Sequence, residues 1–283
     1  MKSVIYLQMN LIPMTAMIMM WVNTERMLSY VWRNRALRFI MLLIAVLLGV
    51  NSLVFCFEGK PGFFIRPLLG ACGLVVFFII EFAAFLWFLY VYDVVKNGDG
   101  QLGKRVLVPA VPVLCAGVLY LLNLFTQGVF YVDAQNYIKA GPFFALYVAV
   151  AGGYLVVACV LALGCYFKET VQEKKRECRC LAVSILFPAG AFLLQRFYPG
   201  IDLFWAFVVI ALLTVYLNIQ KDQVTQDGLT GLNNRRRLDQ YLKSLQERGM
   251  EGENFHFILM DVDKFKKVND TYGHIVGDAV LKL

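Results

Sequence analysis

The chain has 283 residues, of which 59% are hydrophobic and 17% charged, and its mean hydropathy is +0.63. This composition excludes an ordinary soluble globular protein. The formal net charge of +7 arises in residues 1–220, which hold 17 Lys/Arg and 10 Asp/Glu, whereas residues 221–283 hold 10 of each. A nucleic-acid binder would carry its excess positive charge on a soluble domain, so we expect no nucleic-acid partner.

Seven apolar segments follow one another in the first 220 residues. A helix needs about 20 mostly apolar residues to cross a bilayer. The sixth segment is short and contains Pro188 and Gly190, so it is the weakest of the set. We predict a seven-helix transmembrane bundle, which forms a sensory input domain over residues 1–220 in contact with membrane lipid. Its predicted spans are residues 3–22, 38–57, 69–93, 106–126, 143–167, 181–195 and 201–219.

Lysine and arginine are unevenly divided between the two sets of loops that alternate along the chain. In membrane proteins the cytoplasmic loops carry the excess of these residues. The loops after the first, third and fifth spans hold twelve, from Arg26 to Arg179, whereas the N-terminus and the other loops hold five. We therefore predict that the N-terminus lies outside and that residues 221–283 lie in the cytoplasm, with the spans in the inner or plasma membrane of a bacterial cell. The outer loops are too short for a folded sensor domain, so a signal would enter the bundle or come from the lipid.

One acidic residue, Glu81, lies in the middle of the third span, within the sequence VVFFIIEFAAFLWF. A carboxylate is costly in hydrocarbon, so we expect this side chain to face the interior of the bundle. Two roles are compatible with that position. Glu81 is either an intramembrane site for a ligand or a proton, or a partner in an interhelical hydrogen bond.

The cysteines lie mostly inside apolar segments, and their spacing predicts no disulfide framework. Cys178 and Cys180 form a lone C-x-C pair with no histidine nearby. This pair is compatible with a metal site, but plain reduced thiols are the simpler interpretation.

The last span continues into a polar segment without a flexible spacer. Residues 220–227 contain no Gly, Pro or Ser, so we predict that the helix runs on to Gln226. The sequence DGLTGL then ends it, because Gly228 and Gly231 permit positive φ, and Asp227 and Thr230 can cap a turn. A new helix should begin near Asn234 and carry Leu238, Tyr241, Leu242 and Leu245 on one face.

An apolar stretch, Phe255–Met260, is predicted as a buried strand that ends at two aspartates, Asp261 and Asp263. On an extended backbone both carboxylates point to one face. If the chain turns at Val262 instead, the Val262 carbonyl becomes a further oxygen ligand. Oxygen ligands at the end of a strand suit Mg²⁺ with substrate phosphates.

The helix predicted after this edge starts near Lys264 and exposes free N–H groups to phosphates. Phe265, Val268 and Tyr272 should form its apolar face, and Asn269, one turn beyond Phe265, could bond a base. We expect Gly273 to end this helix and the pair Gly277–Asp278 to open the next.

Two stretches in this region, DGLTGLNNRRRLDQYL (227–242) and MDVDKFKKVNDTYGHIVGDAVL (260–281), resemble the first half of a GGDEF domain, the diguanylate cyclase family. The pattern D-x-L-T-G-L-x-N-R-R followed by D-x-D-x-F-K-x-x-N-D-x-x-G-H-x-x-G-D is met at every fixed position. The resemblance covers about one fifth of the chain and leaves the membrane half untouched. It implies a mainly α protein in which a transmembrane bundle precedes the start of an α/β, nucleotidyl-cyclase-like domain.

The resemblance also implies roles for individual residues. Asp261 and the Val262 carbonyl match metal ligands for Mg²⁺ or Mn²⁺, and Asn269 and Asp278 match the pair that bonds the guanine edge of GTP. The turn through Lys264 and Phe265 matches the backbone that receives the phosphates. The positions that match the turn joining input helix and cyclase are Asp227, Thr230 and Arg235.

The Gly-Gly-(Asp/Glu)-Glu-Phe signature of the family does not occur in residues 1–283. Residues 221–283 therefore read as the first half of a cytoplasmic GGDEF domain truncated before that signature, and this chain alone is predicted to be inactive. For the full-length protein, the leading hypothesis is a homodimeric membrane-bound diguanylate cyclase that condenses two GTP into cyclic di-GMP under control of the membrane domain. The alternatives are a degenerate GGDEF receptor that binds GTP or cyclic di-GMP without turnover, and a transporter or receptor with an incidental tail.

Overall fold

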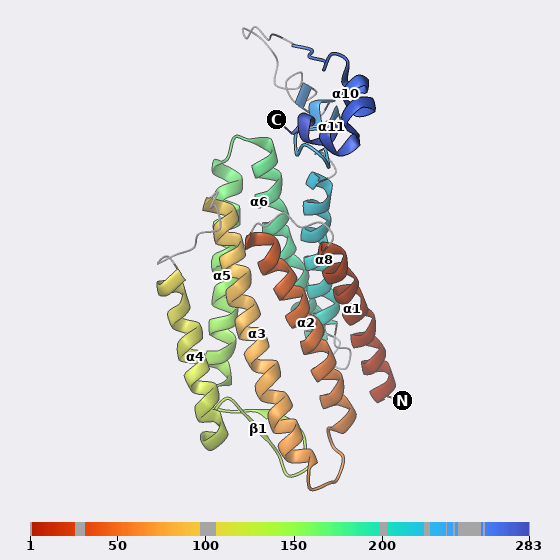
Figure 1. Cartoon of the computed structure of the whole chain (residues 1–283). Helices are drawn as coiled ribbons and strands as arrows, with labels where there is room; N and C mark the ends of the chain where they lie inside the picture. Colours follow the sequence, from red (N-terminus) through yellow and green to blue (C-terminus); the bar gives the residue numbers. More distant parts are fainter. Residues whose placement is uncertain are drawn as a thin grey trace. The chain divides into compact units, whose positions relative to one another are not determined.

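The computed structural model describes residues 2–25, 32–96, 106–197, 203–223, 227–235, 237–239, 241–242, 256 and 258–282. Helices dominate these residues, which confirms the mainly α class (Figure 1). The chain divides into two compact units, Met1–Tyr216 and Leu217–Leu283.

The first unit is a bundle of long helices that lie alongside one another (Figure 1). α3 is the central helix, because it packs against α2, α4, α5 and α6 and against both strands of a small hairpin. Its sequence is apolar on all sides, which is typical of a helix with neighbours all around. The helices are α1 (Lys2–Glu25), α2 (Trp32–Phe57), α3 (Ile65–Lys96), α4 (Leu107–Thr126), α5 (Phe144–Lys168), α6 (Gln172–Ser184), α7 (Leu186–Phe197) and α8 (Phe204–Gln223).

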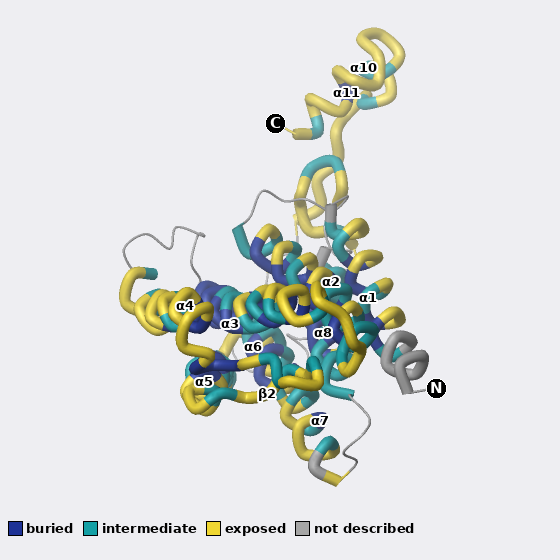
Figure 2. The backbone as a smooth tube through the Cα atoms, turned by 90° about the horizontal axis from the view of Figure 1, so that it is seen from below, coloured by how far each residue is buried: buried dark blue, intermediate teal, exposed yellow. Residues whose placement is uncertain are grey.

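Five segments of the described chain are helical, long and apolar enough to cross a membrane: Trp32–Phe57, Ile65–Lys96, Leu107–Thr126, Phe144–Lys168 and Lys174–Gln195. A shorter apolar helix covers Phe204–Gln220. Many residues of the bundle helices are coloured as exposed in Figure 2. On α4 the exposed residues include the apolar Val108, Leu121 and Phe125. Exposed apolar side chains on such a helix are what a lipid environment requires. The membrane class is therefore confirmed, and the count of seven spans stays a prediction.

The sixth predicted span is longer than expected at its start. α6 begins at Gln172, so the basic residues up to Arg179 lie on a helix and not in a loop. Some of these residues have partners: Lys174 and Arg33 both pair with Glu177, Arg33 also pairs with Asp93, and Lys174 donates to the Val94 carbonyl. α6 and α7 are separated only at Ile185, three residues before Pro188.

One cysteine prediction is wrong. Cys165 near the end of α5 and Cys178 on α6 form a disulfide, with their Cα atoms 6.1 Å apart. Spacing in the sequence could not reveal this pair, because only the close packing of α5 against α6 brings the two residues together. Cys180 is not part of a disulfide, and its thiol donates to the Thr214 carbonyl at 3.7 Å.

A feature that the sequence did not predict covers one end of the bundle. The loop between α4 and α5 forms an antiparallel hairpin of β1 (Phe130–Val132) and β2 (Ile138–Ala140). The hairpin is tied to the loop between α2 and α3, where Ile138 N–H donates to the Glu58 carboxylate and Gly59 N–H to the Asn136 carbonyl. The loop between α2 and α3 and the hairpin thus form one small folded cap.

In the second unit the structure contains α10 (Phe265–Tyr272) and α11 (His274–Leu281), which pack against each other. α11 begins four residues before Asp278, so the expectation that Gly277–Asp278 opens a helix is wrong. Gly273 ends α10 and also precedes the first residue of α11. Tyr272 is exposed, whereas Phe265 and Val268 are half-buried, so only part of the predicted apolar face is covered.

The predicted strand Phe255–Met260 is also wrong where the structure describes it. Ile258, Leu259 and Met260 have no strand conformation, and their side chains are exposed. A strand needs a hydrogen-bonded neighbour, and the described residues of this unit provide none for this segment. Phe255 itself lies outside the described residues.

Candidate functional site

The turn after α8 is held by the Asp227 carboxylate. Its Oδ1 accepts from the N–H of Thr230 at 2.9 Å, from the Thr230 hydroxyl at 2.9 Å and from the N–H of Leu229 at 3.2 Å. These hydrogen bonds favour the ionised carboxylate, so the pKa of Asp227 is lowered, chiefly by the backbone and side-chain bonds from Thr230. The capping role predicted for Asp227 and Thr230 is therefore present.

The same turn fixes the start of the next helical segment. Gly231 has φ +71°, the conformation predicted from its lack of a Cβ, whereas Gly228 does not adopt positive φ. Asn234 Oδ1 then accepts from the Arg237 N–H at 3.2 Å, which is a helix cap at the predicted position. Arg235 is exposed in the first turn that follows. Leu238, Tyr241 and Leu242 are exposed, and Leu245 and Gln226 lie outside the described residues.

The acidic segment before α10 is a turn. Asp261 and Val262 are exposed, and Asp261 Oδ1 accepts from the Val262 N–H at 3.0 Å. Lys264 has φ +53° and directly precedes α10, and its carbonyl accepts from Lys267 N–H at 2.8 Å. The chain therefore turns just after Val262, so the alternative in which the Val262 carbonyl is available beside Asp261 fits better than an extended backbone.

Asn269 and the segment before Asp278 come together where α10 meets α11. Gly277 is buried there, and a Cβ at this position would lie 2.9 Å from Asn269 Cγ and 3.5 Å from the ring of Phe265. Only the absence of a side chain at Gly277 lets Asn269 lie against α11, one residue from Asp278. The sequence match contains Gly277 but assigns it no role; the structure shows that its missing side chain makes room for Asn269.

The donor set for a metal is only partly present. Asp261 and the Val262 carbonyl supply oxygen atoms, which is the ligand type that Mg²⁺ prefers. Among the described residues no group of three or more His, Cys, Asp and Glu side chains gathers in one place. The residues present fit one side of a magnesium site and do not complete it.

In the bundle, Glu81 is buried as predicted, with 1% of its surface exposed. Neither of its carboxylate oxygens has a hydrogen-bond partner among the described residues, so the interhelical hydrogen bond considered from the sequence is not formed. Tyr120 on α4 and Tyr147 on α5 are also buried, and their hydroxyls have no hydrogen-bond partner among the described residues; neither was singled out from the sequence. The sequence feature that could have pointed to them is a tyrosine in the middle of an apolar span.

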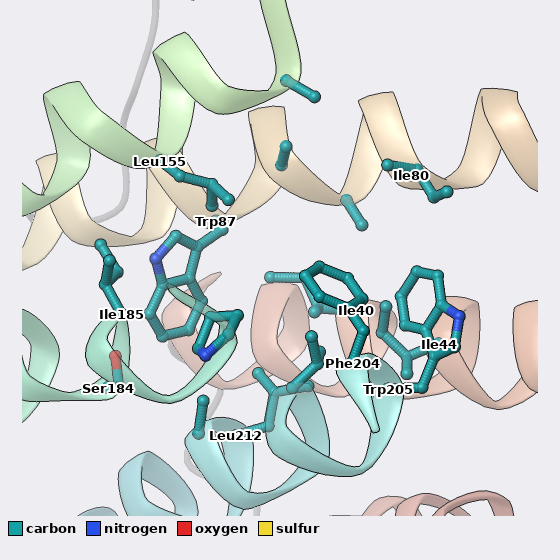
Figure 3. A pocket seen from close by; sticks show the side chains of 16 residues that line it. Ile40, Ile44, Ile80, Trp87, Leu155, Ser184, Ile185, Phe204, Trp205 and Leu212 are labelled. Atoms are coloured by element: carbon teal, nitrogen blue, oxygen red, sulfur yellow. The ribbon is translucent and has the colours of Figure 1, made fainter. Parts of the chain in front are cut away.

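A second feature of the bundle is an apolar pocket of about 130 Å³ between α2, α3, α5, α6, α7 and α8 (Figure 3). Trp87 of α3, with Phe204 and Trp205 of α8, supplies its aromatic walls. Its polar side chain, Ser184, donates its hydroxyl to the Leu181 carbonyl at 2.7 Å and is therefore satisfied within α6. The lining suits an apolar group.

Comparison with known proteins places the second unit in context. Residues 224–283 match the family model described as diguanylate cyclase, GGDEF domain, which confirms the resemblance for this part of the chain. The diguanylate cyclase DgcZ of Escherichia coli is 47% identical over 73 residues, which are 26% of this chain and 22% of that protein. The response regulator PleD of Caulobacter vibrioides is 49% identical over 57 residues, 20% of this chain and 13% of that protein.

An uncharacterised membrane protein of Staphylococcus aureus is 40% identical over 67 residues, 23% of this chain and 19% of that protein. The chain thus matches about a fifth or less of the length of these relatives. No solved structure matches the chain.

Proposed function

We propose that the protein is a membrane-bound diguanylate cyclase whose bundle regulates a cytoplasmic cyclase domain. Two GTP molecules, one on each subunit of a homodimer, would condense to cyclic di-GMP. Each 3′-hydroxyl attacks the α-phosphate of the other nucleotide, each attack releases one pyrophosphate, and the two hydroxyl protons pass to solvent. The match of residues 224–283 supports this reaction class.

The residues of this chain would form one side of the GTP site. Asp261 and the Val262 carbonyl would hold Mg²⁺ or Mn²⁺, and a bound divalent ion neutralises the charge of the phosphates. The N–H groups at the start of α10, around Lys264 and Phe265, would bind phosphate oxygens. Asn269 and Asp278 would bond the guanine edge, and the turn of Asp227, Thr230 and Arg235 would join the input helix to the domain.

The observation that carries the proposal is the contact of Asn269 with Gly277. A family pattern could survive in sequence without any spatial arrangement of its residues. Here the helix pair α10 and α11 places the Asn269 side chain against the residue that precedes Asp278. An amide and a carboxylate are the groups that complement the acceptor and donor edge of guanine.

A cytoplasmic second unit follows from the same proposal, because GTP is a cytoplasmic substrate. The excess of basic residues at the ends of the odd-numbered predicted spans supports this orientation. A reporter fused after residue 223 that is active only in the cytoplasm tests it. Activity of a periplasmic or extracellular reporter at the same position would contradict both the orientation and the cyclase assignment.

A receptor that binds GTP or cyclic di-GMP without turnover is the second candidate. It is supported by Asp261, Asn269 and Asp278, which are suited to binding a nucleotide and do not by themselves require turnover. The two candidates share the nucleotide site and differ in whether product forms.

The deciding experiment supplies GTP and Mg²⁺ to the full-length polypeptide in membranes and measures cyclic di-GMP by mass spectrometry. We expect product from the wild type and a loss of at least about 100-fold in Asp261→Ala, because a metal-binding carboxylate is removed. Asp239→Ala removes an exposed carboxylate at a position outside the family pattern and should retain activity. GTP binding without product would favour the receptor, and equal activity in the two variants would refute the metal assignment.

A further inference from the structure

The apolar pocket beside α8 owes its space to small side chains. Four buried alanines line it, each 8% exposed or less: Ala83 and Ala84 of α3, Ala151 of α5 and Ala211 of α8. Packed protein interiors contain few voids larger than a water molecule. A space of about 130 Å³ exists here because alanine stands at these positions on three different helices.

Aromatic rings form two sides of the same pocket. Trp87 extends from α3, and Phe204 and Trp205 extend from α8 (Figure 3). The rings of Phe204 and Trp205 contact each other edge to face, at 5.1 Å between centroids. Because aromatic rings pair in offset-stacked or edge-to-face arrangements, these walls favour a flat ring between them.

The lining excludes a charged or strongly polar ligand. The described residues that line the pocket carry no charge. The Ser184 hydroxyl already has a partner in the Leu181 carbonyl. The indole nitrogens of Trp87 and Trp205 lie at opposite ends of the pocket in Figure 3, so they cannot bond to one small molecule together. A buried water needs several polar partners, and an unpaired charge would be costly there.

The volume of the pocket sets the size of the ligand. An apolar cavity of about 150 Å³ that is lined by aliphatic and aromatic side chains stays dry and binds benzene. This pocket is slightly smaller, at about 130 Å³, and has the same kind of lining. A molecule that fills such a pocket gains dispersion contacts with all its walls. A single six-membered ring therefore fits.

The pocket lies against the helix that leads out of the bundle. Its residues on α8 recur at helical spacing, at positions 204, 205, 208, 211 and 212, so one face of this helix borders the pocket over about two turns. α8 continues from there to Gln223. A molecule in the pocket would therefore contact the helix that joins the bundle to the second unit.

We infer that this pocket is a binding site for a small, uncharged aromatic molecule of one ring. Trp87, Phe204 and Trp205 pack against the ring, and the alanines of α3, α5 and α8 leave the room that it needs. The contact with α8 places the ligand where it could act as the signal for the cyclase, a role that rests on the proposed function. Binding is measured directly, so the test of the site does not depend on cyclase activity.

The test adds fluorobenzene to the purified full-length polypeptide in detergent micelles and follows its fluorine nuclear magnetic resonance spectrum. A saturable change in the spectrum, beyond the change that micelles alone produce, reports binding. We expect this change in the wild type. Benzene should reverse it at a concentration at least about threefold lower than cyclohexane, which has the same number of carbon atoms and no aromatic ring.

Two variants fill the pocket without changing any charge. Ala211→Leu does so from α8 and Ala84→Leu from α3, and each should abolish the saturable change. The second variant keeps the inference testable if the first folds poorly, and circular dichroism checks the helical content of both. The matched control is Ala116→Leu, the same substitution in a separate cavity of about 120 Å³ between α4 and α5, which should bind as the wild type does.

No saturable change in the wild type overturns the inference, as does an equal change in the wild type and in the folded pocket-filling variants. Loss of the change in Ala116→Leu alone would locate binding in the other cavity and overturn it as well. Equal displacement by cyclohexane and benzene would show that the pocket does not recognise aromatic rings. Suppression of the change by phospholipid, but not by an equal amount of detergent, would show that a lipid chain fills the pocket. Either of these results also overturns the inference.

Discussion

Replacing Asn123 by leucine should detach the hairpin from the bundle. The Asn123 side chain accepts from the N–H of Val129 at 2.7 Å and of Phe130 at 3.2 Å, and its amide donates to the Phe130 carbonyl at 3.2 Å. Leucine has a similar volume, so packing is largely kept and the polar contribution is isolated. The perturbation therefore asks how much three buried hydrogen bonds stabilise this end of the bundle.

The expected loss in the free energy of unfolding is about 2–6 kcal/mol. Val129 and Phe130 are both buried, so their N–H groups cannot turn to solvent without moving the strand. A buried donor left without a partner costs about 1–3 kcal/mol, and two donors are left here. Asn123→Asp keeps both accepting bonds and places an oxygen against the Phe130 carbonyl, so its loss should be smaller, about 1–2 kcal/mol.

The assay is unfolding by sodium dodecyl sulfate in mixed micelles, followed by far-ultraviolet circular dichroism, with free energies compared between variants. Leu124→Ala changes the adjacent residue, which is 61% exposed, and should shift the free energy by no more than about 0.5 kcal/mol. If Asn123→Leu behaved like Leu124→Ala, the hairpin would not depend on Asn123 and the reasoning from buried donors would be refuted.

Three other predictions test single contacts. Gly277→Ala should displace Asn269 and weaken GTP binding roughly tenfold in a titration, whereas Gly228→Ala, with open space around its Cβ, should not. Tyr154→Phe removes a hydroxyl that donates to the Pro109 carbonyl and accepts from Val113 N–H, so hydrogen exchange of the Val113 amide should become faster. Because the folded pKa of Asp227 lies below its ordinary value of 3.8, its turn should be intact above that pH and lose its bonds as pH falls through the folded value. Constant nuclear magnetic resonance shifts of the Thr230 amide across that range would contradict the last prediction.

The class of the first unit could be predicted because the requirement for apolar helices in lipid acts on composition alone. The burial of Glu81 followed from the same rule, since a carboxylate in the middle of an apolar span has to face protein. The Cys165–Cys178 disulfide and the hairpin could not be predicted in this way. Both depend on which helices and loops become neighbours, and periodicity carries no information about that.

In the second unit, the local features could be predicted and the element that depends on a distant partner could not. Short-range features were predictable: the bonds of Asp227 with Thr230, the cap at Asn234 and the positive φ of Gly231 each involve residues within a few positions of one another. The prediction of a strand at Phe255–Met260 was wrong in its described part. A strand forms only beside a hydrogen-bonded partner, and an apolar segment does not indicate where that partner lies. The contact of Asn269 with Gly277 lies between these two cases in sequence separation, because it joins two helices that follow each other directly in the chain.

One helix, α3, connects the aromatic cluster around Tyr120 and Tyr147 to the apolar pocket beside α8. On α3, Ile80 packs on the aromatic cluster with Tyr120 and Tyr147, and it also lines the apolar pocket with Phe204 and Val208 of α8. A change in the packing around Phe77 and Glu81 would therefore act on a side chain that touches both regions. Because α8 continues to Gln223 without a break, a shift or rotation at the pocket would be carried along it and not absorbed in a flexible spacer.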